Sequence, residues 1–193
     1  MPKRFVSIWF RHLTTDWFTL RQPDLRGLPF VLAKPDHGRM VVSAVNALAE
    51  AQGINTGMAV ADARAIIPSL KVLDDRPDLS GKLLKDIAEW FIRYTPIVSI
   101  DADDGLILDA TGCAHLWGGE EAYLEHIVTR LKNSGYEVRA AMADTIGTAW
   151  AISHFGRSVF IIRNNEQTTA LLSLPPEALR LDVESIELLP GAS

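Results

Sequence analysis

Cysteine and long apolar runs are scarce in this sequence. Cys113 is the one cysteine among 193 residues, which excludes an internal disulfide and favours a reducing cytoplasm. The longest apolar runs, such as FVSIWF and SVFII, fall far short of the roughly 20 residues that cross a bilayer, so no membrane span is expected. An arginine directly follows the first of these runs, and a cleaved signal peptide is not expected either. These features predict a globular cytoplasmic protein.

Several common catalytic motifs are also missing. The patterns GxxxxGK[ST], GxGxxG and GxSxG do not occur, which excludes a P-loop, a dinucleotide-binding fingerprint and a hydrolase elbow. The segment TGCAHLWGG, residues 111–119, holds one Cys and one His. Without further partners these make neither a zinc site nor a catalytic dyad, and the other histidines show no metal-ligand spacing. We expect a structural turn at 111–119, no bound metal and no cofactor.

The net charge is small, but it is unevenly distributed. At −5 overall, the chain does not have the excess of basic residues typical of a general nucleic-acid binder. Residues 1–40 carry seven Lys and Arg against three Asp, a balance of +4 that leaves −9 for the remainder. Basic residues interleaved with aromatic ones suit contact with a nucleic-acid backbone, and equally suit a solvated face. The candidate DNA-binding residues are Arg21, Lys34 and Arg39.

Apolar periodicity predicts a mixed succession of strands and helices. Residues 4–10 have the β-branched and aromatic content of a buried strand. A helix is expected over 43–53, with a Ser cap and a terminal glycine, and a second one over 57–68. A long amphipathic helix over 78–94 precedes two strands within 95–111, which an Asp-Gly pair joins as a hairpin. The further expected elements are strands at 29–33, 136–143 and 158–162 and helices at 119–135 and 145–155.

The order of these elements predicts an α+β fold with an inserted subdomain. Joined to the first strand, the elements from residue 78 onward run helix, strand, strand, helix, strand, followed by a helix and an edge strand. This is the order of a ferredoxin-like antiparallel sheet with helices on one face. Residues 12–77 interrupt it and are expected to form a small helical subdomain. The tail 166–193 ends on LLPGAS, where another helix should begin, so we expect a fragment of a longer protein.

Four carboxylates gather in SIDADDGLILD, residues 99–109. Asp101 and Asp109 lie in or beside the expected strands, and Asp103 and Asp104 lie in the turn. A two-metal site for phosphoryl transfer needs such oxygen ligands, but it draws them from several strands, and the first strand has no acid. Because Asp also tolerates turn geometry, the favoured interpretation is that these residues form the turn.

Four segments resemble the Y-family (DinB/UmuC-like) translesion DNA polymerases over nearly the whole chain. They are AEAQGINTGMAVADARAIIPSL, RYTPIVSID, LILDATGCAHLWGG and AAMADTIGTAWAISHF. The forms DATGCAHLWGGE and TPIVSIDADDGLILD are similar to one catalytically deficient branch, the ImuB-type proteins of bacterial SOS mutagenesis. The resemblance implies a palm formed by residues 1–11 and 78–165, fingers formed by 12–77, and the start of a truncated thumb at 166–193.

The resemblance fails at the positions that bind metal. In active members the first strand carries Asp, an apolar residue and Asp, and the matching positions here are Ser7 and Trp9. The hairpin glutamate of the family corresponds to Gly105 if the match is anchored on LILD, or to Ala102 if it is anchored on SID. Without these carboxylates the usual two-metal clamp cannot form.

The positions that bind the incoming triphosphate also differ. Active members present a Tyr and an Arg from the fingers, and the matching residues are Ala47 and Glu50, of which the second would repel phosphate. The sequence therefore predicts a polymerase fold without polymerase activity.

The resemblance implies a function in DNA repair by translesion synthesis. The chain is expected to be part of a non-catalytic adaptor that recruits an error-prone polymerase to damaged DNA in the bacterial cytoplasm, at the nucleoid. Implied partners are damaged or primer-template DNA, a sliding clamp, an ImuA-type protein and an error-prone polymerase subunit. A clamp-binding peptide and a full thumb would be expected after residue 193.

Two alternatives stay open. The first is an active, divergent polymerase that uses Asp101, Asp104 and Asp109 with Mg²⁺ in an altered arrangement. The second is an interaction module that binds neither DNA nor metal. Primer extension separates the first alternative from the adaptor, and DNA binding across a salt series separates the second.

Overall fold

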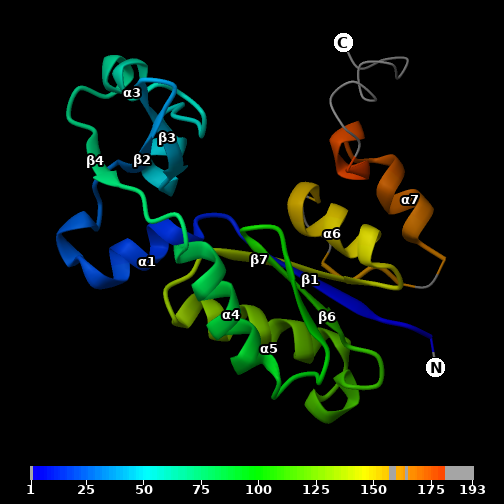
Figure 1. The fold of residues 1–193 in the computed structure, drawn as a ribbon. Helices are drawn as coiled ribbons and strands as arrows, with labels where there is room; N and C mark the ends of the chain where they lie inside the picture. The colour runs from blue at the N-terminus through cyan, green and yellow to red at the C-terminus, as the bar shows by residue number, and fades with distance from the viewer. Residues whose placement is uncertain (1, 157–159, 164, 181–193) are drawn as a thin grey trace. The chain divides into compact units, whose positions relative to one another are not determined.

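The computed structural model describes residues 2–156, 160–163 and 165–180, which fall into two compact units (Figure 1). The first unit contains the chain up to Phe10, Leu84–Leu131 and the residues from Val138 onward. The second contains Arg11–Leu83 and Lys132–Glu137. Both units combine a sheet with helices, which confirms the α+β class. Of the segment expected to begin a thumb, residues 181–193 lie outside the described residues.

Four strands build the sheet of the first unit: β5 (Val98–Asp101), β6 (Gly105–Asp109), β1 (Phe5–Phe10) and β7 (Val138–Ala143), antiparallel and in that order. The central strand β1 carries the β-branched and aromatic side chains that favour strands. Its pairing places Ser7 opposite Ile107 of β6 and Ala141 of β7. The predicted hairpin of β5 and β6 is confirmed.

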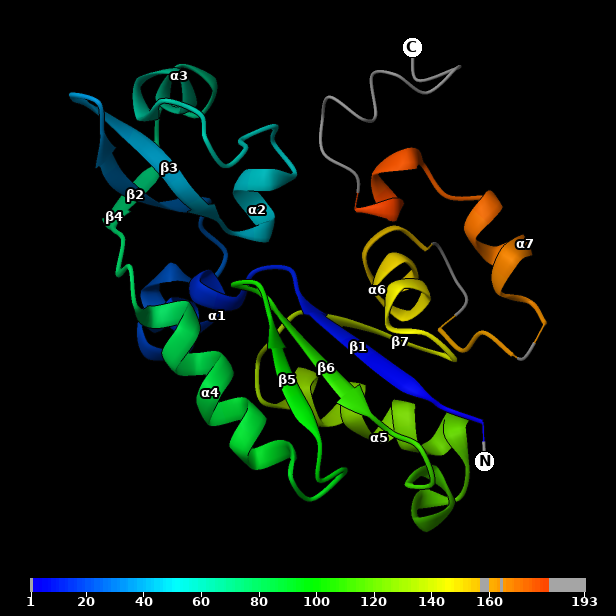
Figure 2. The same cartoon turned by 45° about the vertical axis from the view of Figure 1, so that its right-hand side comes forward.

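Helices cover both faces of this sheet. One face holds α4 (Leu79–Phe91), which belongs to this unit from Leu84 onward, and α5 (Glu120–Asn133); α6 (Ile146–Phe155) lies on the other (Figures 1 and 2). The prediction that helices cover one face is therefore wrong for α6. Helix α6 packs there because Ala141 and Ala143 of β7 form an apolar cluster with Ala149 and Ile152 of α6, and the small alanine side chains allow close packing.

Short elements follow α6. The helix α7 (Gln167–Leu172) and the 3₁₀ helix η3 (Pro176–Leu179) both pack against α6. Of the predicted strand 158–162, residues 158 and 159 lie outside the described part, and Ile161 forms a parallel bridge with Met142. The expected turn at 111–119 contains the 3₁₀ helix η2 (Ala114–Trp117).

A three-stranded sheet forms the centre of the second unit. Its order is β3 (Arg39–Val45), β2 (Phe30–Asp36) and β4 (Lys71–Asp74), and β2 and β4 are parallel. The strand expected at 29–33 is confirmed as part of β2, but the prediction of a mainly helical subdomain is wrong, because β3 and β4 pair with β2. The apolar residues up to Val45 pair with β2, so the helix expected from Ser43 begins only after Asn46, which caps it. The helical elements are α1 (Leu13–Arg21), η1 (Pro23–Leu25), α2 (Ala47–Glu50) and α3 (Val60–Ile66).

Apolar side chains from both the strands and the helices of the second unit form its core. One cluster joins Val31 of β2 and Val42 of β3 to Ala63 of α3, and a second joins Phe18 of α1 to Phe30 of β2. Burial of this kind supplies the main favourable term in folding. In the described residues of either unit, no helix is long and apolar enough to span a membrane.

Candidate functional site

One face of the first unit's sheet carries the positions that the sequence analysis matched to catalytic residues of the Y-family. The strand register places Asp101 of β5, Gly105 of β6, Trp9 of β1 and Arg139 of β7 in one row. Residues that lie opposite one another in antiparallel strands project from the same face. Ser7 stands on this face two residues before Trp9, so the central strand contributes no carboxylate to it.

Ser7 is held by helix α6. Its side chain is almost completely buried, and its Oγ lies 3.0 Å from Oγ of Ser153. Ser153 also donates a hydrogen bond of 2.9 Å to the carbonyl of Trp150. The hydroxyl of Ser7 therefore has a neutral partner inside the protein, where an aspartate would need a cation.

Trp9 connects the hairpin to α6. Its Nε1–H donates a hydrogen bond of 2.9 Å to Oδ2 of Asp104, and its ring stacks on His154 at a centroid distance of 4.6 Å. The guanidinium of Arg139 lies 5.9 Å from the Trp9 ring centroid. The indole of Trp9 thus lies beside the hairpin and provides a hydrogen-bond donor to one of its carboxylates, that of Asp104.

Trp150 and Arg180 extend the contact between Trp9 and His154 into a stack of four side chains. We call Trp9, His154, Trp150 and Arg180 the planar stack. His154 and Trp150 stack at 4.3 Å, and the Arg180 guanidinium lies 4.0 Å above the Trp150 ring. Arg180 also forms an ion pair with Asp101. Burial lowers the pKa of His154, which favours a neutral ring, and its Nδ1 lies 2.9 Å from the Trp150 carbonyl.

The remaining hairpin acids have local structural roles. Asp109 Oδ1 accepts a hydrogen bond of 3.0 Å from the Thr111 amide, an arrangement typical of Asp at a chain turn. Asp103 is exposed. The turn comprises residues 102–104, and Ala102 has a φ of +52°. The Asp-Gly pair predicted the hairpin correctly, but Gly105 begins strand β6 and is not the left-handed turn residue.

Gly105 stands where little space is left for a side chain. A Cβ added there would lie 3.0 Å from the carbonyl oxygen of Asp101 and 3.4 Å from that of Ile8. Both neighbours are backbone atoms of paired strands, which cannot move easily. A glutamate at this position would therefore require the hairpin to shift.

The residues on this face do not fit a pair of Mg²⁺ ions. Such ions need near-octahedral oxygen ligation with carboxylates from more than one element. Across residues 2–156, 160–163 and 165–180, no group of three or more His, Cys, Asp or Glu side chains is arranged to hold a metal. Asp101 already pairs with Arg180, and Asp104 with Trp9.

The second unit holds the two positions compared with triphosphate-binding residues. Ala47 and Glu50 lie on α2, and Ala47 offers no polar side chain. Glu50 Oε2 lies 2.8 Å from Nη2 of Arg11 and 3.4 Å from Nε2 of His12. Glu50 therefore pairs within its own unit. The sequence analysis missed Arg11 and His12, although two basic residues directly after a strand were a usable signal.

Besides Glu50, two more acidic residues, Glu137 and Asp16, lie near His12. Its Nδ1 lies 3.0 Å from the Val45 carbonyl, and its Nε2 lies 3.6 Å from a carboxylate oxygen of Glu137. Asp16 accepts a hydrogen bond of 2.7 Å from the Glu137 amide. Burial raises the pKa of Asp16 to about 6, so this carboxylate changes charge close to neutral pH.

The candidate DNA-binding residues occupy different parts of the second unit. Arg21 stacks its guanidinium 4.1 Å above the Trp17 ring, and Arg76 lies 5.2 Å from the same ring. Lys34 and Arg39 are exposed on β2 and β3. Arg21 therefore has an intramolecular contact, whereas Lys34 and Arg39 present their charge to solvent.

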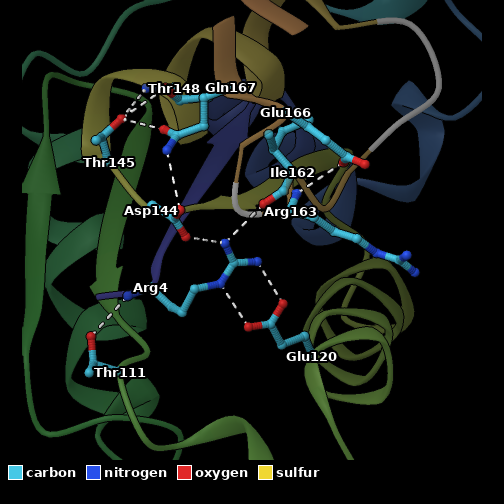
Figure 3. A network of polar contacts seen from close by, with 10 residues as sticks. All are labelled: Arg4, Thr111, Glu120, Asp144, Thr145, Thr148, Ile162, Arg163, Glu166 and Gln167. Atoms are coloured by element: carbon cyan, nitrogen blue, oxygen red, sulfur yellow. Dashed lines mark hydrogen bonds and ion pairs between the residues drawn. The ribbon is translucent and has the colours of Figure 1, made fainter. Parts of the chain in front are cut away.

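Arg4 organises a polar network that the sequence analysis missed (Figure 3). Its guanidinium donates two hydrogen bonds to Glu120, of 2.7 and 2.6 Å, and one of 2.6 Å to Asp144. A further bond of 2.9 Å reaches the Ile162 carbonyl. The planar guanidinium suits this bidentate geometry. Arg4, which directly precedes β1, thus connects this strand to α5, to the residue after β7 and to the segment 160–163.

Comparison with known proteins identifies related sequences. Residues 8–154 match the model of the impB/mucB/samB family. Protein ImuB of Caulobacter vibrioides is 46% identical over 129 residues, which are 67% of this chain and 28% of that protein. DNA polymerase IV of Serratia proteamaculans is 31% identical over 105 residues, or 54% of this chain and 30% of that protein. The chain spans less than a third of either relative.

Solved structures share the fold at low sequence identity. DinB from Sulfolobus solfataricus superposes with a TM-score of 0.80 at 18% identity, over 95% of this chain and 55% of that one. A post-insertion binary complex of Dbh DNA polymerase gives a TM-score of 0.78 at 19% identity, over 91% and 52% of the two chains. At this identity the likeness demonstrates a common fold alone.

Proposed function

Because this chain belongs to the impB/mucB/samB family of Y-family-polymerase-like proteins and is a homologue of ImuB, we propose that it is part of a non-catalytic DNA-repair protein. In this proposal it is the polymerase-like core of an adaptor in translesion synthesis, and a separate error-prone polymerase carries out the chemistry. In this proposal residues 1–11 and 78–165 form a palm, residues 12–77 form fingers, and residues 166–193 are the start of a thumb.

One observation carries the proposal. The central strand presents Ser7 and Trp9 on the face where active relatives need carboxylates, and both side chains are engaged by the protein itself. Phosphoryl transfer by two metal ions requires ligands that bridge them at the centre of the site. The pairing of Glu50 with Arg11 adds a second difference at the proposed triphosphate site.

The proposed partners follow from the family relationship. They are damaged or primer-template DNA, a sliding clamp, an ImuA-type protein and an error-prone polymerase subunit, in the cytoplasm of a bacterium. The similarity to DNA polymerase IV of Serratia proteamaculans supports DNA as a ligand class. The partners would be recruited by the full-length protein.

Primer extension on the full-length protein tests the absence of catalysis. With Mg²⁺ or Mn²⁺ and all four nucleotides, we expect no product above the level of an Asp104→Ala variant. The natural positive control is an active Y-family polymerase on the same template. Incorporation by the wild-type protein that Asp104→Ala abolishes would contradict the proposal and favour the divergent polymerase that uses Asp101, Asp104 and Asp109.

A further inference from the structure

Two carboxylates of the hairpin, those of Asp101 and Asp104, need partners because both are partly withdrawn from water. The Asp101 side chain is only 18% exposed, and Asp104 is half-buried. A carboxylate withdrawn from water is costly unless a cation or hydrogen-bond donors satisfy it. In active relatives metal ions would serve this purpose, so the residues here must have a substitute.

The chain supplies both substitutes itself. Arg180 directs its guanidinium to Asp101, and Trp9 donates its indole N–H to Asp104 at 2.9 Å. The two donors come from opposite ends of the described sequence. They meet at one hairpin because η3 packs against α6 and brings Arg180 back to the sheet face.

The planar stack links these two donors into one structure. From Arg180 through Trp150 and His154 to Trp9, successive groups lie 4.0, 4.3 and 4.6 Å apart. An arginine can pair with a carboxylate through its edge while its face covers an aromatic ring, which a lysine cannot do. A neutral His154 also adds no positive charge between the two tryptophans.

We propose that Arg180 and Trp9 take the place of metal ions at Asp101 and Asp104, and that the planar stack closes this sheet face to divalent cations. Arg180 is then an internal cation, and the stack holds residues 176–180 against α6. The proposal deepens the proposed function and rests on it, since it gives a physical cause for the loss of metal binding. The proposed function concerns only the missing metal ligands. The present proposal adds that side chains of the protein itself occupy the site.

The experiment is a titration of the 193-residue chain with Mn²⁺, followed by the electron paramagnetic resonance signal of the free ion. The variants are Arg180→Ala, Arg180→Lys and the double variant Trp9→Asp/Arg180→Ala, and the matched control is Arg163→Ala. Arg163 is an exposed arginine of the same unit. Thermal unfolding by circular dichroism identifies any variant that does not fold.

We expect the wild type, Arg163→Ala and Arg180→Lys to bind Mn²⁺ equally weakly, because each retains a cation beside Asp101. Arg180→Ala should bind about fivefold more tightly, as expected for loss of a partly exposed ion pair. Adding Trp9→Asp should increase the affinity further. Tryptophan emission should change in both Arg180 variants, because neither covers Trp150 with a planar group.

Two results would overturn the proposal. One is submillimolar binding of Mn²⁺ by the wild type, and the other is an Arg180→Ala variant that binds no better than Arg163→Ala. Arg180→Ala replaces a side chain that is 44% exposed, so it decides the matter even if the double variant does not fold. Tight Mn²⁺ binding by the wild type without primer extension would refute only the proposal that Arg180 and Trp9 replace metal ions. Primer extension by the wild type would refute the proposed function.

Discussion

At the scale of single residues, three of the positions that differ from the expected catalytic pattern have a polar partner in a neighbouring side chain. Ser7 meets Ser153, Trp9 meets Asp104, and Glu50 meets Arg11. Unpaired polar groups in such places would cost about 1–3 kcal/mol each. The partners of Ser7, Trp9 and Glu50 therefore contribute to the stability of the fold at these positions.

Asp16 gives a pH-dependent prediction at this scale. Burial raises its pKa in the folded state from 3.8 to about 6, so between these values the folded protein binds more protons than the unfolded one. The contribution of Asp16 to stability is therefore greatest below pH 4 and is lost as the pH rises to about 6. Asp16→Asn should remove this slope and stabilise the protein at pH 7.5 by about 1–3 kcal/mol.

Urea denaturation of both proteins at pH 4.5 and 7.5 measures the effect. Asn retains an oxygen that can accept the Glu137 amide, so the variant tests the charge and leaves the hydrogen bond in place. Asp62→Asn, at an exposed position of α3, is the control. An identical pH dependence of wild type and Asp16→Asn would contradict the prediction.

At the scale of elements, caps and pairing decide where the short helices begin. Sequence periodicity located α3, α4, α5 and α6 closely, because each has a continuous apolar side or a clear cap. It placed the start of α2 too early, since Ser43 also looks like a cap. Asn46 is the actual cap because Val45 is already committed to pairing with Val31 of β2.

Asn46 should therefore be a stability determinant of the second unit. Its Oδ1 accepts the amides of Ala49 and Phe30 at 3.0 and 3.1 Å, and its Nδ2 donates to the Leu28 carbonyl at 2.9 Å. Asn46→Ala should lower the free energy of unfolding by about 1–3 kcal/mol, through the lost cap and the unpaired amides.

Urea denaturation and hydrogen exchange at the Ala49 amide provide the measurements. Asn55→Ala is the control, since Asn55 is exposed and makes one local bond to Gly53. We expect it to change stability by less than about 0.5 kcal/mol. Equal effects of the two substitutions would show that the Asn46 cap contributes nothing specific.

At the scale of the whole molecule, charge is segregated along the sequence. The first 40 residues carry a balance of +4 within a chain of net charge −5. Lys34 and Arg39 are exposed residues of that section, whereas Arg21 lies against Trp17. If DNA contacts this section, the exposed side chains of Lys34 and Arg39 can reach its phosphates.

The salt dependence of DNA binding tests these two residues. We expect the wild type to bind primer-template DNA weakly, and Lys34→Ala/Arg39→Ala to reduce the slope of log K against log salt. Each lost phosphate contact should remove about 0.7–0.9 from that slope. Arg64→Ala/Lys71→Ala removes the same charge from exposed positions of the same unit. Equal slopes for the two double variants would refute a specific role for Lys34 and Arg39.

The sequence by itself determined the α+β class, the hairpin, the long helices and the absence of acids from the first strand. These depend on local patterns, and the substitutions at Ser7 and Trp9 are visible without coordinates. Tertiary structure alone decided what the remaining acids contact. Arg180 reaches Asp101 across 79 positions, and Arg4 reaches Asp144 across 140. Spacing along the chain cannot reveal such pairs, because packing of the sheet and α6 creates them.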